Sequence, residues 1–170
     1  MPQYSAVGLG NAIMDALVRV PNDSVIERLG FTKGQMTPVD DEKWQAVHAL
    51  LESHGVELAS GGSCANTIAS MGLMGANVSY AGRIGDDALG HTYRASLLEA
   101  CGAHALQVTA DHPTGKCLSI ISQDAERTML TDLGASVTMP GLGDFDAMIR
   151  DSEILHVTGY LLLGEPMASR

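Results

Sequence analysis

Strand-like and helix-like segments alternate along this 170-residue chain, and that alternation limits the possible folds more than any other feature. Strand patterns lie at residues 4–9, 16–20, 78–82 and 154–158, and helical patterns lie between them at residues 38–54, 65–74, 89–100 and 145–151. Strands that are separated by helices tend to run parallel, with the helices packed on their faces. The sequence therefore predicts an α/β fold with a mostly parallel, Rossmann-like sheet and helices on both faces.

Two adjoining strand patterns, at residues 116–121 and 127–130, interrupt this alternation. The polar turn between them, residues 123–126, predicts a β-hairpin inserted into the α/β chain. The first long helix is expected to be capped by Thr37 and to begin at Pro38. Its apolar stripe is expected to comprise Trp44, Val47, Leu50 and Leu51, and Gly55 is expected to end it.

Composition and charge exclude several classes of function. The net charge is −10 and the ten basic residues are scattered, so no cluster of Lys and Arg is available to bind nucleic acid. No apolar run reaches the roughly 18 residues of a membrane helix, and the first residues lack a signal-peptide pattern. We therefore expect a cytoplasmic protein with no membrane partner. The three cysteines form no CxxC pair and the six histidines lack metal-binding spacing, so we expect reduced thiols and no metal site in this chain.

Two common nucleotide-binding motifs fail when they are tried on the chain. A G-x-G-x-x-G pattern that begins at the glycine at position 8 would need a third glycine where the chain has Ile13. A P-loop ending at Gly115 and Lys116 would need a hydroxyl residue where the chain has Cys117. Any phosphate-bearing ligand must therefore be held in another way.

Two short clusters have the chemistry of a hydroxyl-binding site. Gly61 and Gly62 precede the helical pattern that contains Asn66, and glycines there let a ligand approach the backbone at a helix N-terminus. Asn11 and Asp15 follow the first strand pattern, where open α/β sheets bind ligands. A carboxylate can accept two hydroxyl hydrogen bonds, which suits the cis-diol of a ribose. Each cluster also has a structural interpretation, because glycine and aspartate are common turn residues.

Together these residues resemble the N-terminal signature of the ribokinase-like, or pfkB, carbohydrate kinase family, over essentially the whole chain. Within the family the chain resembles the members that phosphorylate adenosine. The residues that carry this resemblance are Gly10, Asn11, Asp15, Gly61, Gly62, Ser63, Asn66, the segment 113–117, Arg127, Gly159 and Tyr160. The resemblance implies transfer of the γ-phosphoryl group of ATP, bound with Mg²⁺, to the 5′-hydroxyl of a ribonucleoside.

The resemblance also implies roles for the matching positions. Asn11 and Asp15 would hold the sugar hydroxyls, and the sugar would be lined by Gly61, Gly62, Ser63 and Asn66. The base would be bordered by Gln35, Thr37, Cys117, Met129 and Leu133, with Tyr160 stacked near it.

A small β lid is implied as well, at about residues 14–37 and 111–136, on a core of about residues 1–13, 38–110 and 137–170. Arg127 would move with the lid and pair with Asp15 or with phosphate charge, or it is simply a solvated charge of the hairpin. The lid is also where a homodimer would form.

One departure from the family pattern concerns catalysis. The family's catalytic aspartate lies in a glycine-rich motif near the far end of its members, and the nearest string here, residues 141–144, is interpreted as a loop and helix cap at Asp144. The chain is thus expected to be the N-terminal, substrate-binding half, with no catalytic residue of its own apart from Arg127 and with most of the ATP and Mg²⁺ site absent. We expect it to be inactive alone. A kinase of another sugar and a non-catalytic binding or dimerising fragment remain alternatives.

Overall fold

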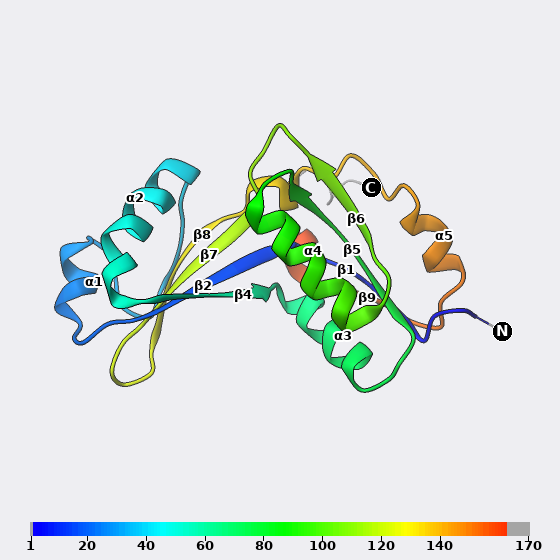
Figure 1. The fold of residues 1–170 in the computed structure, drawn as a ribbon, viewed down its shortest axis with the longest axis horizontal. Coiled ribbons are helices and arrows are strands. Elements are labelled where there is room, and N and C mark those ends of the chain that lie inside the picture. Colours follow the sequence, from blue (N-terminus) through cyan, green and yellow to red (C-terminus); the bar gives the residue numbers. More distant parts are fainter. Residues whose placement is uncertain (1, 163–170) are drawn as a thin grey trace.

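The computed structural model of the chain describes residues 2–162, which form two sheets joined end to end in an elongated molecule (Figure 1). The four-stranded sheet has the order β6-β5-β1-β9, and the five-stranded sheet has the order β3-β8-β7-β2-β4. Consecutive segments of the chain pass back and forth between the two sheets. The places where they pass bring residues from distant parts of the sequence together.

The four-stranded sheet is parallel throughout, as the alternation of patterns predicts. Helices α3 and α4 pack on one face and α5 packs on the other, which confirms the predicted fold class. The elements of this part are β1 (Ala6–Leu9), α3 (Ser63–Leu73), β5 (Val78–Gly85), α4 (Ala88–Cys101), β6 (Ala105–Thr109), α5 (Phe145–Arg150) and β9 (Leu155–Val157).

The five-stranded sheet is mixed, and the predicted hairpin is its β7–β8 pair. Helices α1 and α2 cover one face, because the alternate side chains Ala16, Val18, Leu118, Ile120 and Leu130 pack against Trp44 and its neighbours. Its elements are β2 (Ile13–Arg19), α1 (Ser24–Arg28), β3 (Met36–Pro38), α2 (Asp41–Leu51), β4 (Val56–Gly61), β7 (Gly115–Ile121) and β8 (Arg127–Asp132). We call the opposite face, with the side chains of Asp15, Cys117 and Met129, the open face.

Three short 3₁₀ turns complete the described chain: η1 (Glu52–His54), η2 (Gly134–Val137) and η3 (Gly159–Leu162). Among residues 2–162 no helix is long and apolar enough to cross a membrane.

The structure corrects the predicted start of the first long helix. That helix begins at Asp41, and its cap is Asp40, whose Oδ1 accepts a hydrogen bond of 2.8 Å from the Lys43 amide. Thr37 and Pro38 instead belong to the short strand β3, which pairs with β8. Pro38 is compatible with an edge strand, where its missing N–H costs nothing. The predicted stripe is correct except for Leu50, which is 67% exposed.

Strands β4 and β6 were not predicted from the sequence. In β4 the side chains of Glu57, Leu58 and Ala59 are exposed, so the segment lacks the buried alternation that marks a strand. Because β4 pairs with β2 and α2 packs on the same sheet, much of residues 38–61 lies with the five-stranded sheet and not with the four-stranded one. The division into a core and a mobile lid stays a prediction. The sequence also suggests the start of another helix at Glu165 and Pro166, and these residues lie outside the described range.

The chain passes between the two sheets at four places: residues 10–12, 61–62, 113–115 and 132–134. Backbone atoms approach one another closely there. A Cβ atom on Gly115 would lie 2.9 Å from the Ala12 carbonyl oxygen, and one on Gly134 would overlap the Pro113 carbonyl oxygen. Glycine is therefore needed at positions 115 and 134 for the crossings to pack closely. The packed crossings in turn determine which residues meet where the two sheets join.

Candidate functional site

The candidate site lies where β2 and β4 meet the start of α3. Asp15 is in the middle of β2, between Ala59 of β4 and Cys117 of β7, and its carboxylate rests against Gly61. A Cβ atom on Gly61 would lie 2.7 Å from Cγ of Asp15 and nearer still to Oδ2. Only glycine at position 61 therefore leaves the Asp15 carboxylate in this place.

The second glycine turns the chain from β4 into α3. Gly62 has φ +94°, which L-residues with side chains rarely adopt, and a Cβ atom there would overlap the Asn11 carbonyl oxygen. Its own carbonyl accepts a hydrogen bond of 2.9 Å from the Asn66 amide in the first turn of α3. The two-glycine turn thus brings Asn11, Asp15 and the N-terminus of α3 together.

The polar groups at this junction have unused hydrogen-bonding capacity. Oδ1 of Asn11 is buried and has no hydrogen-bond partner among the described residues. The Asp15 carboxylate likewise accepts no hydrogen bond from residues 2–162. Ser63 and Asn66 are exposed at the start of α3. Such groups can accept hydrogen bonds from a ligand that carries hydroxyls.

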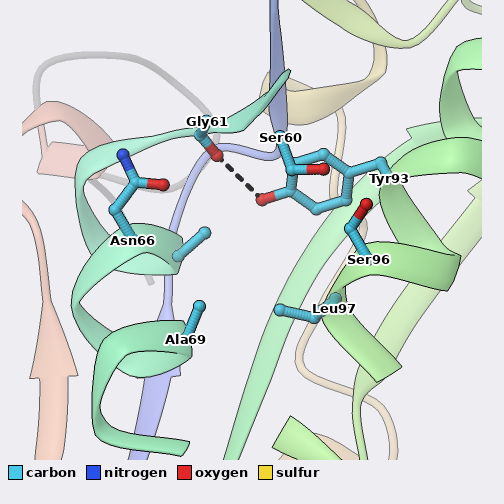
Figure 2. A pocket seen from close by; sticks show the side chains of 8 residues that line it. Ser60, Gly61, Asn66, Ala69, Tyr93, Ser96 and Leu97 are labelled. Carbon is cyan, nitrogen blue, oxygen red and sulfur yellow. Dashed lines mark hydrogen bonds between the residues drawn. The ribbon is translucent and has the colours of Figure 1, made fainter. Parts of the chain in front are cut away.

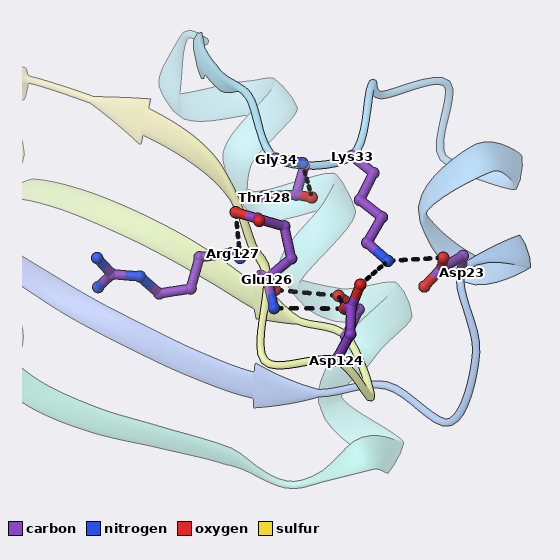
Figure 3. Close-up of polar contacts among 8 residues, drawn as sticks. Asp23, Lys33, Gly34, Asp124, Glu126, Arg127 and Thr128 are labelled. Carbon is purple, nitrogen blue, oxygen red and sulfur yellow. Dashed lines mark hydrogen bonds and ion pairs between the residues drawn. The ribbon is translucent and has the colours of Figure 1, made fainter.

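Burial and the nearby Arg127 act in opposite directions on the pKa of Asp15. Burial raises the pKa of its carboxyl group, and the positive charge of Arg127 opposes that shift. Arg127 begins β8, and its side chain extends away from the ion pairs at the hairpin tip (Figure 3). The guanidinium is therefore within electrostatic reach of the site, although it is exposed to solvent.

Beyond Asp15 the open face becomes less polar. Cys117 is 7% exposed, and its Sγ accepts a hydrogen bond of 3.4 Å from Oγ1 of Thr131. Burial raises the pKa of the Cys117 thiol, so the thiol stays protonated and adds no charge to the open face. Met129 pairs in register with Ser119 on the same face. This surface could contact a flat, weakly polar group.

Four residues predicted to border the base lie on segments other than β2, β4 and the start of α3. Thr37 pairs with Leu130, so strand alternation directs it to the face covered by α2 and away from Met129. Gln35 is exposed beside β8, where its carbonyl accepts a hydrogen bond of 2.9 Å from the Met129 amide. Leu133 and Tyr160 are 40% and 66% exposed. The predicted role of these four residues beside a base stays a prediction.

Sequence reasoning missed a buried lysine directly behind Cys117. Lys116 is 2% exposed; its Nζ forms an ion pair with Asp41, lies 3.7 Å from Oδ2 of Asp132, and sits 5.1 Å from the centre of the Trp44 ring. A signal was available, because strand alternation places Lys116 on the apolar face of β7, where a charge needs partners.

A second missed residue is Asp87, the cap of α4. Its carboxylate accepts hydrogen bonds from the Gly90 amide at 2.8 Å and from the amide and hydroxyl of Thr114 at 2.8 and 2.7 Å. Burial acts to raise the pKa of Asp87, but these hydrogen bonds outweigh it and lower the pKa. Asp87 therefore anchors α4 to one of the crossings between the sheets.

Behind the two-glycine turn, between α3 and α4, lies a hollow of about 90 Å³ (Figure 2). The Tyr93 hydroxyl reaches across from α4 and donates a hydrogen bond of 3.1 Å to the Gly61 carbonyl. The hollow is lined by Ser60, Gly61, Ala65, Asn66, Ala69, Tyr93, Ser96 and Leu97. Gly61 is thus contacted by Asp15 on one side and by Tyr93 on the other.

Ion pairs join the segments at the tip of the five-stranded sheet. Nζ of Lys33 lies 2.8 Å from Asp23 and 2.7 Å from Asp124, which ties the chain before β3 to α1 and to the β7–β8 turn (Figure 3). The Gly34 amide adds a hydrogen bond of 3.0 Å to Oγ1 of Thr128. These contacts are far from Asp15 in the sheet and are structural.

No group of three or more His, Cys, Asp or Glu residues within the described range 2–162 is arranged to hold a metal ion.

Asp144, predicted to cap a helix, occupies the position before α5 but makes no capping hydrogen bond with its side chain. Its backbone there is already helical, with φ −62° and ψ −17°, which removes it from the usual capping geometry.

Comparison with known proteins identifies similar sequences and folds. The profile of the pfkB family of carbohydrate kinases matches residues 32–169. The solved adenosine kinase from Sinorhizobium meliloti is 30% identical, with a TM-score of 0.84 over 98% of this chain and 50% of its own. A probable sugar kinase from Rhizobium etli CFN 42 is also 30% identical, with a TM-score of 0.82 over 95% of this chain and 48% of its own.

A more distant structure shares the fold alone. The adenosine kinase from Schistosoma mansoni, solved with adenosine in an occluded loop conformation, is 18% identical with a TM-score of 0.79, over 95% of this chain and 48% of its own. The chain therefore spans about half the length of each of these three structures.

Proposed function

Because this chain belongs to the pfkB family of carbohydrate kinases, we propose that it forms the acceptor-binding part of an ATP-dependent kinase that phosphorylates the ribose 5′-hydroxyl of adenosine. The family membership rests on the profile match and on the 30% identity to a solved adenosine kinase over nearly the whole chain. The activity and the acceptor are our proposal, since the chain spans about half of that structure.

The observation that carries the proposal is the junction of Asn11, Asp15 and Gly61. The ionised Asp15 carboxylate can accept hydrogen bonds from two neighbouring hydroxyls, and the absence of a side chain at Gly61 leaves the carboxylate in place beside the turn. Oδ1 of Asn11 has no hydrogen-bond partner within residues 2–162 and can accept a further hydroxyl hydrogen bond. Three acceptors at one turn suit the hydroxyl groups of a ribose.

The base would lie on the open face of the five-stranded sheet. Cys117 and Met129 present sulfur atoms and little charge there, which suits the flat face of a purine. Leu133 and Tyr160, exposed at η2 and η3, and Gln35 beside β8 would reach the base only after the two sheets close on it. Thr37 faces away, and we leave it out of the proposed site.

In this proposal the chain's own residues bind and orient the acceptor. Asp15 and Asn11 fix the ribose, and fixing the ribose places its 5′-oxygen, which must attack the γ-phosphorus in line. Arg127 would keep Asp15 ionised in the open state and would meet phosphate charge when the five-stranded sheet closes as a lid. Closure would also exclude water from the transferred phosphoryl group.

Mg-ATP supplies the phosphoryl group and charge neutralisation in this family's reaction. Among residues 2–162 no group of carboxylates is arranged to hold Mg²⁺. We propose that most of the ATP site and the catalytic base belong to a part of the kinase that this chain does not contain. The half-length coverage of the solved kinases supports that proposal.

Calorimetric titration of the chain with adenosine, ribose, fructose and adenine tests the function. We expect saturable, one-to-one binding of adenosine, with weaker binding of ribose and of adenine, because only adenosine fills both the polar junction and the open face. Stronger binding of fructose or ribose would favour a kinase of another sugar, which the likeness to a probable sugar kinase also suggests. No binding of any of the four would contradict the proposed function.

A further inference from the structure

Helix α4 touches two of the four crossings between the sheets, and neither contact was anticipated from the sequence. At its start, Asp87 holds the amide and hydroxyl of Thr114 at the crossing 113–115. Six residues later, the Tyr93 hydroxyl holds the Gly61 carbonyl at the crossing 61–62. A single rigid helix thereby sets the position of two crossings at once.

Tyr93 is well placed to fix that second crossing. Its side chain is 1% exposed and packs in the core with Ile68, Tyr80 and Leu97, so its ring cannot easily change rotamer. Burial raises the pKa of its hydroxyl well above the ordinary value for tyrosine, which keeps it a neutral donor at all ordinary pH values.

The Gly61 peptide lies between this donor and the acidic group of the site. The Asp15 carboxylate packs against Cα of Gly61, so a movement of that peptide changes the space and the solvent around Asp15. The same turn contains Gly62, whose carbonyl accepts a hydrogen bond from the Asn66 amide in the first turn of α3. The hydrogen bond from Tyr93 of α4 to the Gly61 carbonyl therefore supports the turn that contacts Asp15 and leads into α3.

We propose that Tyr93 is a positioning residue of the acceptor site: its hydroxyl holds the Gly61 carbonyl, and with it the two-glycine turn, in the place against which Asp15 packs. The effect on acceptor binding rests on the function proposed above, whereas the effect on the turn and on Asp15 does not. Two separate measurements can therefore test the two parts.

The first measurement is the pKa of Asp15, followed by NMR of its carboxyl carbon in the wild-type chain, Tyr93→Phe and Ser96→Ala. Ser96 is the matched control, because it lines the same hollow on α4 but its hydroxyl bonds only to the Thr92 carbonyl. Charged or titratable groups near Asp15 are Arg127 on β8, Cys117 on β7 and Tyr93 on α4, with Glu57 on the same face of β4. None of the others is altered in these variants.

In Tyr93→Phe we expect the turn to loosen and water to reach Asp15, so its pKa falls from the raised wild-type value towards the ordinary one. The Asn66 amide, bonded to the Gly62 carbonyl, should exchange its hydrogen about tenfold faster, as expected for loss of one buried hydrogen bond nearby. Ser96→Ala should change neither. Wild-type values of both quantities in a folded Tyr93→Phe chain, or equal changes in Ser96→Ala, would overturn the inference.

If Tyr93→Phe does not fold, the wild-type chain decides the question. A Tyr93 hydroxyl proton that exchanges slowly enough to be observed, with a nuclear Overhauser contact to Gly61, supports the inference, and failure to detect that contact overturns it.

The second measurement is calorimetric titration with adenosine. Tyr93→Phe should weaken binding about tenfold while Ser96→Ala binds as the wild type does, in keeping with the free energy of one buried hydrogen bond. Equal binding by Tyr93→Phe and wild type, with an unchanged pKa of Asp15, would overturn the positioning role and leave the proposed function intact. Absence of adenosine binding by the wild type would refute the proposed function, and the NMR result would still decide the role of Tyr93.

Discussion

Replacing Gly61 with alanine should disturb the site through one contact. Gly61 does not have a positive φ, so an alanine backbone is permitted there, and the three atoms nearest to the new methyl group would all belong to Asp15. That methyl carbon would lie 2.7 Å from Cγ of Asp15. Carbon atoms in contact are separated by about 3.5–4.0 Å, so the carboxylate must move by about 1 Å or more.

The cost follows from the crowding. Overpacking of this kind destabilises a protein by about 1–3 kcal/mol. For a chain of this size that corresponds to a fall in Tm of roughly 2–12 °C. Displacing Asp15 should also remove charge-assisted hydrogen bonds to the ligand, each worth about 1.5–3 kcal/mol, and weaken adenosine binding by at least about tenfold.

A double-mutant cycle identifies the cause. We expect Gly61→Ala to lower Tm in the wild-type background but to have less than half that effect in an Asp15→Ala background, where the clashing atoms are gone. Thermal unfolding followed by circular dichroism measures all four chains. An equal fall in Tm in both backgrounds would refute the argument that Gly61 is required because of Asp15.

Four further outcomes follow from the structure. Asp15→Ala should weaken adenosine binding at least about tenfold in calorimetry, with little change in Tm. The control Glu57→Gln, on the same face of the sheet, should bind adenosine normally. Normal binding by Asp15→Ala would remove Asp15 from the site. Because hydrogen bonds lower the pKa of Asp87, its ionised form stabilises the fold above the ordinary carboxyl pKa, and this contribution is lost as pH falls through the lowered pKa. The Tm difference between wild type and Asp87→Asn should therefore be constant near neutral pH and shrink in acid; a difference independent of pH would contradict this. The hairpin, residues 116–135, should exchange amide hydrogens faster than residues 61–75 if it belongs to a mobile lid, and equal protection would count against a lid. The chain with adenosine and Mg-ATP should release ADP no faster than a blank, and adenosine-dependent ADP release by the purified chain would show that it contains a complete catalytic site.

The parts of the fold that the sequence predicted are those with a strong local pattern. The parallel strands β1 and β5 are largely apolar and buried, and helix α4 has a clear stop at Gly102, which adopts the left-handed conformation expected of a C-cap. Strands β4 and β6, which were missed along with β3, have mostly exposed or half-buried side chains, so their pairing is decided by tertiary contacts rather than by local pattern.

The candidate site was predictable where a residue type has a backbone reason to be there. Gly61 and Gly62 are needed for close packing. Asp15 was expected just before a strand at residues 16–20, but it lies inside β2, which already begins at Ile13. The orientation of Thr37 was missed because a proline after it was taken as a helix start, whereas the strand pairing of β3 fixes its direction. Tyr93 could not be found from the sequence, since nothing local distinguishes a tyrosine that packs in a core from one that also holds a distant carbonyl.

The most direct test of the account is to locate adenosine on the chain by backbone NMR. A titration of the ¹⁵N-labelled protein should shift the amides of Asn11, Asp15, Gly61 and Gly62 first, with the β7 and β8 amides around Cys117 and Met129 following to the same saturation point. Shifts confined to other surfaces, such as the tip around Lys33 and Asp124, would contradict the claim that the two-glycine turn and the open face form the acceptor site.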